Sequence, residues 1–150
     1  MSDLIAFLNA RLDEVEAAAK AADPGPWEVG ERGGQDSMVW IREKDSPGID
    51  NVGITYRKPV FTAQVSNIRF RENARHIARH DPARVLRDVE ADRKLIAAYE
   101  AARSDVPPVD DWYEVAHGIR IGLADGLESA LKIRAERFSD HPDYQPEWAS

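Results

Sequence analysis

Aspartate–proline steps divide this chain into separate helical segments. Proline cannot continue a helix and restricts the residue before it, so the sequence Asp-Pro-Gly-Pro at 23–26 must end the first helix. At Asp81-Pro82 the aspartate can cap a new helix, and the proline stands at the first helical position, where its missing N–H costs nothing. The sequence therefore predicts short, individually capped helices instead of one long helix.

Apolar residues recur at steps of three and four in four segments, which is the pattern of helices with one buried face. The predicted helices span 3–22, 67–80, 82–102 and 111–137. Residues 27–65 hold short runs of branched and aromatic residues between turn formers, which is typical of strands. We therefore expect an α+β fold, in which a small antiparallel sheet of three to four strands (about 27–65) packs against the N-terminal helix and the C-terminal helices. The tail at 139–150 is expected to be an extended segment on the body.

Length and composition limit the classes of protein to consider. A chain of 150 residues has the size of one ordinary domain, so we expect a single domain over 1–150. A formal net charge of −7 argues against bulk binding to nucleic acid or to an anionic membrane. The chain has no cysteine, which excludes disulfides and cysteine-based zinc sites. An acidic N-terminal segment and the lack of a run of about 20 apolar residues predict a cytoplasmic protein that does not enter the membrane.

Three of the four histidines stand beside Asp and Pro residues, at two places in the chain. His76 and His80 are four residues apart and would share one helix face, a spacing that can hold a divalent metal ion. His141 or Asp143 would have to complete such a site. Capping and packing are the favoured interpretation, because His80 stands at a predicted helix end, where a partly cationic ring stabilises the terminal carbonyls. No other cofactor is predicted.

Arginines gather around the same helix junction. Between residues 67 and 87 six arginines face only two carboxylates, which leaves a local charge of +4. Arg75, Arg79 and Arg84 could bind a phosphate group, an acidic partner or a nucleic acid. Ion pairing with the chain's own carboxylates is the favoured interpretation, and nucleic acid is not the expected partner.

The last predicted helix carries a strip of small residues at steps of four, namely Gly118, Gly122, Gly126 and Ala130. Each glycine costs about 1 kcal/mol relative to alanine inside a helix, so something should offset about 3 kcal/mol. A strip of small residues lets another helix approach closely. We favour the preceding helix of the same chain as that neighbour, and the alternative is the same helix of a second copy in a homodimer. Aromatic residues that could add a contact surface, or else bury the tail, are Trp112, Tyr144 and Trp148.

Three segments resemble an uncharacterised protein family of actinomycetes and of the phages that infect them. They are AADPGPW at 21–27, NARHIARHDPARVLRDVEADRKLI at 73–96 and SDHPDYQPEW at 139–148. The first of them, followed by strands and an Asn-Ala helix, is also similar to small early accessory proteins of temperate phages. The resemblance implies a phage or prophage origin and a role in modulating the host or the phage cycle. It brings no activity and no site residues.

No complete catalytic set is recognisable, so we lean towards a protein without enzymatic activity. We expect it to act by binding another protein, of the host or of a phage, and to be able to form a homodimer. One alternative is a metal-dependent hydrolase that uses His76 and His80 with His141 or Asp143. The other is a nucleic-acid-binding protein that uses the arginine-rich junction.

Overall fold

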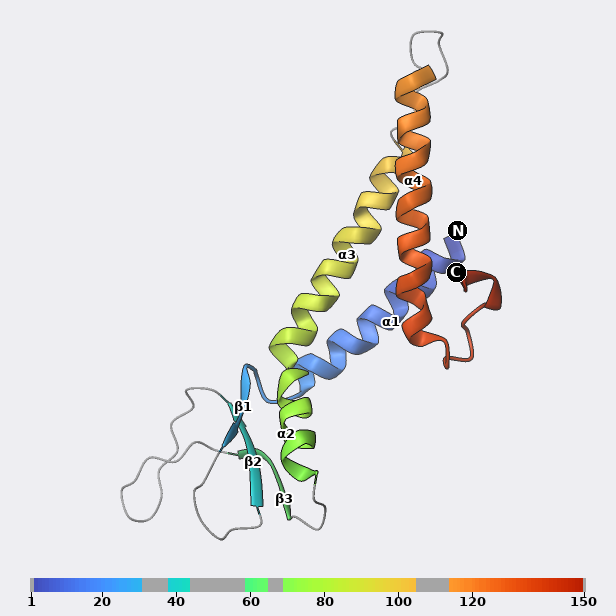
Figure 1. Ribbon diagram of the computed structural model, residues 1–150. Coiled ribbons are helices and arrows are strands. Elements are labelled where there is room, and N and C mark those ends of the chain that lie inside the picture. Colours follow the sequence, from blue (N-terminus) through green and yellow to red (C-terminus); the bar gives the residue numbers. More distant parts are fainter. Residues whose placement is uncertain (1, 31–37, 44–58, 65–68, 105–113, 150) are drawn as a thin grey trace. The chain divides into compact units, whose positions relative to one another are not determined.

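The computed structural model describes residues 2–30, 38–43, 59–64, 69–104 and 114–149 (Figure 1). Its helices are α1 (Ser2–Ala21), α2 (Phe70–Arg79), α3 (Pro82–Ser104) and α4 (Glu114–Ala135). Its strands are β1 (Trp27–Gly30), β2 (Met38–Glu43) and β3 (Pro59–Gln64), and two 3-10 turns, η1 (Glu136–Phe138) and η2 (Pro146–Trp148), follow α4. Among these helices none combines the length and the apolar character of a membrane span.

The expected α+β fold, built on a sheet of three to four strands, is wrong, because the protein is mostly helical. Among the residues whose side chains the structure describes, the buried apolar ones come from the α-helices and from η2. The three strands are four to six residues long and pair antiparallel in the order β1-β2-β3. The half-buried Trp27 and Val29 of β1 pack against two small residues of α2, Ala74 and Ala78. Helices therefore supply the core that the structure describes.

The helices follow the predicted bounds to within three residues, because their start and stop signals are local. The prediction that Asp81-Pro82 starts a helix is confirmed. The Asp81 carboxylate accepts the backbone N–H of Arg84 at 3.0 Å, and α3 begins at Pro82. At the other side of the junction α2 ends at Arg79, and the backbone N–H of His80 is donated to the Ile77 carbonyl.

The predictions for the tail, for one strand and for the linker have other outcomes. The tail at 139–150, expected to be extended, instead contains the turn η2, and backbone N–H groups between Ser139 and Ala149 donate to carbonyls three residues earlier. The strand expected near 52–56 and the linker at 105–113 lie outside the described residues.

The chain forms two compact units, and the single domain over 1–150 stays a prediction. One unit, here called the acidic unit, consists of Met1–Glu14 and Val89–Ser150, and the other, the junction unit, is Val15–Asp88. In sequence, the acidic unit has eight Lys and Arg against sixteen Asp and Glu, whereas the junction unit has twelve against eleven. The acidity of the whole chain is therefore confined to the acidic unit.

A buried carboxylate holds α3 to the end of α4 within the acidic unit. The Asp92 side chain is only 6% exposed. Arg137 Nη2 donates to its Oδ2 at 2.5 Å, and Arg134 Nε lies 3.1 Å from its Oδ1 as an ion pair without hydrogen-bond geometry. A second ion pair, between Arg93 Nη2 and Asp13 Oδ1 at 2.7 Å, joins α3 to α1.

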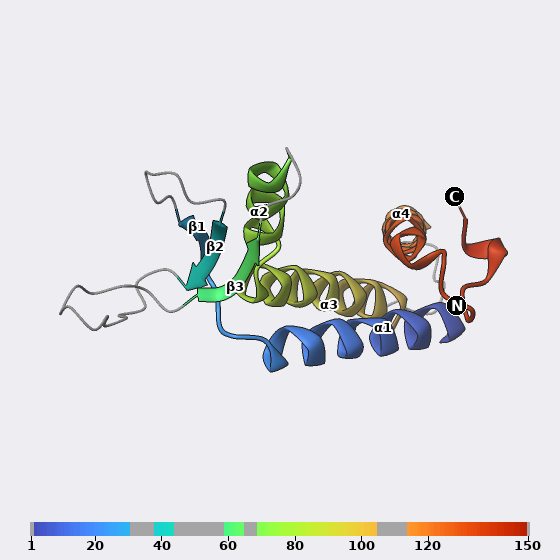
Figure 2. The ribbon, with the colours of Figure 1, turned by 90° about the horizontal axis from the view of Figure 1, so that it is seen from below.

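In the junction unit, the strands lie beside α2, as both views show (Figure 2). The chain enters β1 through Gly25, which lies against the start of α3. A Cβ built at Gly25 would collide with Asp81 Oδ1 and would lie 2.9 Å from the backbone nitrogen of Ala83. Only a residue without a side chain allows this close approach.

Candidate functional site

The three histidines of the predicted metal site are divided between the two units. His76 of α2 and His80, the residue that follows α2, belong to the junction unit, where their exposed rings lie 4.6 Å apart between centroids. His141 belongs to the acidic unit. Among the described residues no group of three or more His, Asp or Glu side chains is placed to hold a metal ion. The metal site and the hydrolase that joins His76 and His80 to His141 or Asp143 stay predictions.

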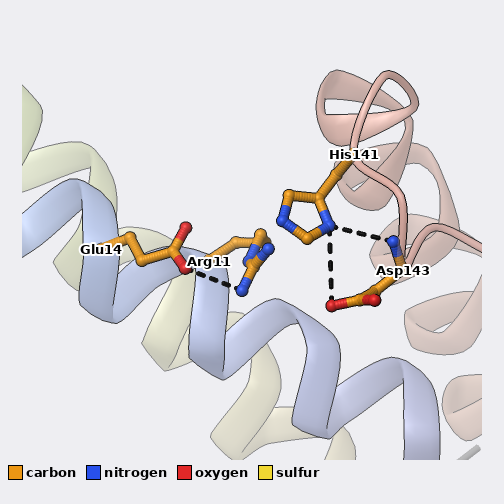
Figure 3. Close-up of polar contacts among 4 residues, drawn as sticks. All are labelled: Arg11, Glu14, His141 and Asp143. Carbon is orange, nitrogen blue, oxygen red and sulfur yellow. Dashed lines mark hydrogen bonds and ion pairs between the residues drawn. The ribbon is translucent and has the colours of Figure 1, made fainter.

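His141 instead takes part in a polar arrangement above α1 (Figure 3). Its Nδ1 accepts the backbone N–H of Asp143 at 3.1 Å, and Asp143 Oδ2 lies 3.8 Å from the same nitrogen. The figure shows the ring pointing towards the guanidinium of Arg11.

Sequence reasoning missed Arg11, which is only 9% exposed. Its Nη2 donates to Glu14 Oε1 at 2.8 Å, and its guanidinium carbon lies 5.6 Å from the centre of the Phe7 ring. Its Nε and Nη1 are buried and have no hydrogen-bond partner among the described residues. A signal was present, because Arg11 follows Phe7 by four residues and Leu8 by three, and so shares the buried face of α1.

Two of the three aromatic residues predicted to form a contact surface pack within the protein. Around Phe7, the ring centroid of Tyr144 lies at 6.2 Å and that of Trp148 at 5.0 Å. Trp148 is buried, and Tyr144 keeps part of its surface open. These contacts support the alternative in which the aromatic residues fix the tail. Trp112 lies outside the described residues.

The strip of glycines on α4 lies open. The helix buries Ala124, Leu131 and Ala135 on one side. On the opposite side, no described atom outside the helix lies within 4 Å of a Cβ built at Gly118, Gly122 or Gly126. The favoured prediction, that the preceding helix covers the strip, is therefore wrong for the described part of α3.

Large apolar side chains accompany the glycines on that side. Ile119 is 68% exposed, Leu123 55% and Ile133 58%. At 100° per residue, the side opposite the buried residues forms one surface, here called the outer face of α4. Its members are Gly118, Ile119, Gly122, Gly126, Ser129 and Ile133. The charged residue at its edge is Asp125.

The arginine cluster is divided between two settings. Arg75 and Arg79 line a groove of about 330 Å³ with Trp27, Val29 and Ala78. Arg84 is engaged within α3 and with the end of α2, because its Nε lies 3.8 Å from Asp88 Oδ2 and its Nη1 donates to the Arg79 carbonyl.

Comparison with known proteins gives one match. A family model described as a family of unknown function (DUF6221) matches residues 1–150. No curated protein and no solved structure matches the chain. The match agrees with the resemblance to an uncharacterised family, whereas the actinomycete and phage origins stay predictions.

Proposed function

We propose that this chain, which belongs to the family of unknown function DUF6221, is a protein-binding molecule whose outer face of α4 pairs with the same face of a second copy. The observation that carries the proposal is the open glycine strip between exposed isoleucines. Three glycines inside a helix cost about 3 kcal/mol relative to alanine. No contact that the structure describes offsets this cost, whereas a helix from a second copy could lie close against the strip.

The outer face is self-complementary when two copies of α4 run antiparallel and cross at Gly126. Ile119 and Ile133 each stand seven positions from Gly126, so Ile119 of one copy faces Ile133 of the other. Gly122 and Ala130, each four positions away, face each other in the same way. The glycines at the centre allow close approach, and the four isoleucines cover the two ends of the contact.

Charge and size set the strength of this pairing. The acidic unit has an excess of eight carboxylates over basic residues, so two copies repel each other. Salt screens such repulsion, and the dimer should therefore tighten as ionic strength rises. One helix face is smaller than the roughly 1,200–2,000 Å² buried in stable complexes, so we expect a weak dimer whose population depends on concentration.

The variant Gly126→Leu tests the pairing. A leucine there meets no described atom of its own chain but places two bulky side chains at the crossing point of the dimer. We expect the wild type to self-associate at high micromolar concentration in high salt and Gly126→Leu to bind at least about tenfold more weakly, which is about 1.4 kcal/mol. Analytical ultracentrifugation over a concentration series measures both.

Ala98→Leu is the matched control, because it adds the same side chain at an exposed position of α3. It should self-associate as the wild type does. A wild type that stays monomeric at every salt concentration, or a Gly126→Leu protein that dimerises equally well, contradicts the proposal.

The setting of this function is proposed from the resemblance of residues 21–27, 73–96 and 139–148 to actinophage and early phage accessory proteins. It supports a phage or prophage protein that modulates the host or the phage cycle, with a host or phage protein as a further partner. A cytoplasmic location belongs to the same proposal.

A further inference from the structure

A groove on the junction unit lies where β1 meets α2, and it has a volume of about 330 Å³. Trp27 and Val29 of β1 form one wall, and Arg75, Ala78 and Arg79 of α2 form the other. Arg75 and Arg79 are four residues apart, so their side chains follow each other along one helix face. The groove thus places an indole beside two guanidinium groups.

The aromatic wall is held in place before any ligand arrives. Trp27 Nε1 donates to the Asp23 carbonyl at 3.1 Å, and the ring packs with Val29 against Ala74 and Ala78. A ring fixed in this way loses little conformational freedom when another planar group stacks on it. The small alanines of α2 let β1 approach closely enough for Trp27 to share the groove with Arg75 and Arg79.

The charge around the groove favours an anion. The junction unit has no excess of carboxylates, although the whole chain carries −7. Among the described residues, no carboxylate is paired with the Arg79 guanidinium, whereas Arg84 lies near Asp88. Arginine is the residue best suited to phosphate, because its planar group can donate two parallel hydrogen bonds to phosphate oxygens.

We infer that this groove binds a nucleotide unit, with its base against Trp27 and its phosphate group at Arg75 and Arg79. A phosphate alone would leave the indole without a role, and a carboxylate side chain brings no aromatic ring to stack. Aromatic side chains beside basic residues are the combination that binds nucleotides in single strands.

A free mononucleotide and a single-stranded nucleic acid share this chemistry, and two probes separate them. AMP is titrated by calorimetry, and a fluorescently labelled short oligothymidine by anisotropy, with inorganic phosphate as the reference ligand. Binding of AMP alone identifies a free nucleotide as the ligand class, and stronger binding of the oligonucleotide identifies a strand. With two phosphate contacts, the affinity for the strand should fall roughly sevenfold between about 50 and 200 mM salt.

Four variants locate the site. Arg79→Ala should weaken the binding of the better probe about tenfold, and Trp27→Leu, which keeps an apolar side chain but removes the ring, about fivefold or more. Arg87→Ala is the matched control, because it removes the same charge from the arginine cluster at an exposed position that does not line the groove. It should change affinity less than about twofold. Circular dichroism checks that each variant is folded, and Arg79→Lys supplies a second variant that keeps the charge and loses the planar group.

The inference is overturned if neither AMP nor the oligonucleotide binds more tightly than inorganic phosphate. It is equally overturned if Arg87→Ala weakens binding as much as Arg79→Ala, because the attraction then comes from general charge and not from the groove. Self-association through α4 is measured separately and should be the same for all four variants. Salt strengthens self-association and weakens nucleotide binding, so the two proposals can fail independently.

Discussion

Replacing Phe7 with alanine is expected to destabilise the protein by about 3–5 kcal/mol, the range for a buried Phe cut to Ala. Phe7 is 7% exposed, and its ring stands at the centre of the contacts that fix the tail. Phe138, His141, Tyr144 and Trp148 all place their rings within 6.2 Å of it, measured between centroids. Without the phenyl group these four rings lose their common partner, and a cavity remains. The melting temperature should fall by roughly 10 °C for a chain of this length.

Urea unfolding and limited proteolysis measure the two consequences of Phe7→Ala. The unfolding midpoint should drop, and trypsin should cut after Arg137 and release residues 138–150 more rapidly. Ile77→Ala is the control, because Ile77 is 40% exposed and its loss should change stability by no more than about 0.5 kcal/mol. An unfolding midpoint and a cleavage rate equal to those of the wild type would show that the tail does not depend on Phe7.

Local signals in the sequence located the helices well. Asp81 and Pro82 start α3, and in α1 Leu4, Leu8 and Leu12, which recur every four residues, are all buried. Arg11 stands on the same buried face, although charged side chains of a helix usually face solvent. Its burial depends on the tail, which arrives from the far end of the chain and places His141 opposite it.

Local sequence signals do not show which secondary-structure elements form the core. Short branched segments between 27 and 65 do form strands, but their length decides how much apolar surface they can cover. Helices of about 20 residues cover more, and they supply the core. The fold class depends on which helices and strands pack against each other. This packing is set by contacts between residues that are far apart in the sequence.

The candidate sites likewise combine features that are visible in the sequence with features that depend on packing. The glycine strip and the arginine cluster are both visible as patterns in the sequence. What faces the strip, and which arginines share a groove, depend on packing. Trp27 joins Arg75 and Arg79 only because Ala74 and Ala78 let β1 approach α2. No local pattern connects residues so far apart in sequence.

Gly25→Ala is expected to destabilise the protein by about 2–4 kcal/mol. A methyl group at Gly25 would collide with Asp81 Oδ1 and lie 2.9 Å from the backbone nitrogen of Ala83, so the start of α3 must shift. Overpacking of this kind typically costs about 1–3 kcal/mol. Loss of the Asp81 cap, whose carboxylate accepts the Arg84 N–H, adds about 1 kcal/mol. Urea unfolding followed by circular dichroism measures the change.

Gly122→Ala is the matched control, because it makes the same chemical change where a Cβ meets nothing within 4 Å. Alanine is the better helix former, so this variant should stabilise the protein by about 1 kcal/mol. The two Gly→Ala changes should therefore shift the free energy of unfolding in opposite directions. A general preference for alanine over glycine cannot produce this difference.

A double-mutant cycle with Asp81→Ala separates the two parts of the Gly25 effect. Asp81→Ala alone removes the cap and should cost about 1 kcal/mol. In that background one of the two collisions is gone, so Gly25→Ala should cost about 1 kcal/mol less than it does in the wild type. Equal costs in both backgrounds would mean that Gly25 and Asp81 do not touch. The inferred contact between the two aspartate–proline steps, which holds β1 to the start of α3, would then be wrong.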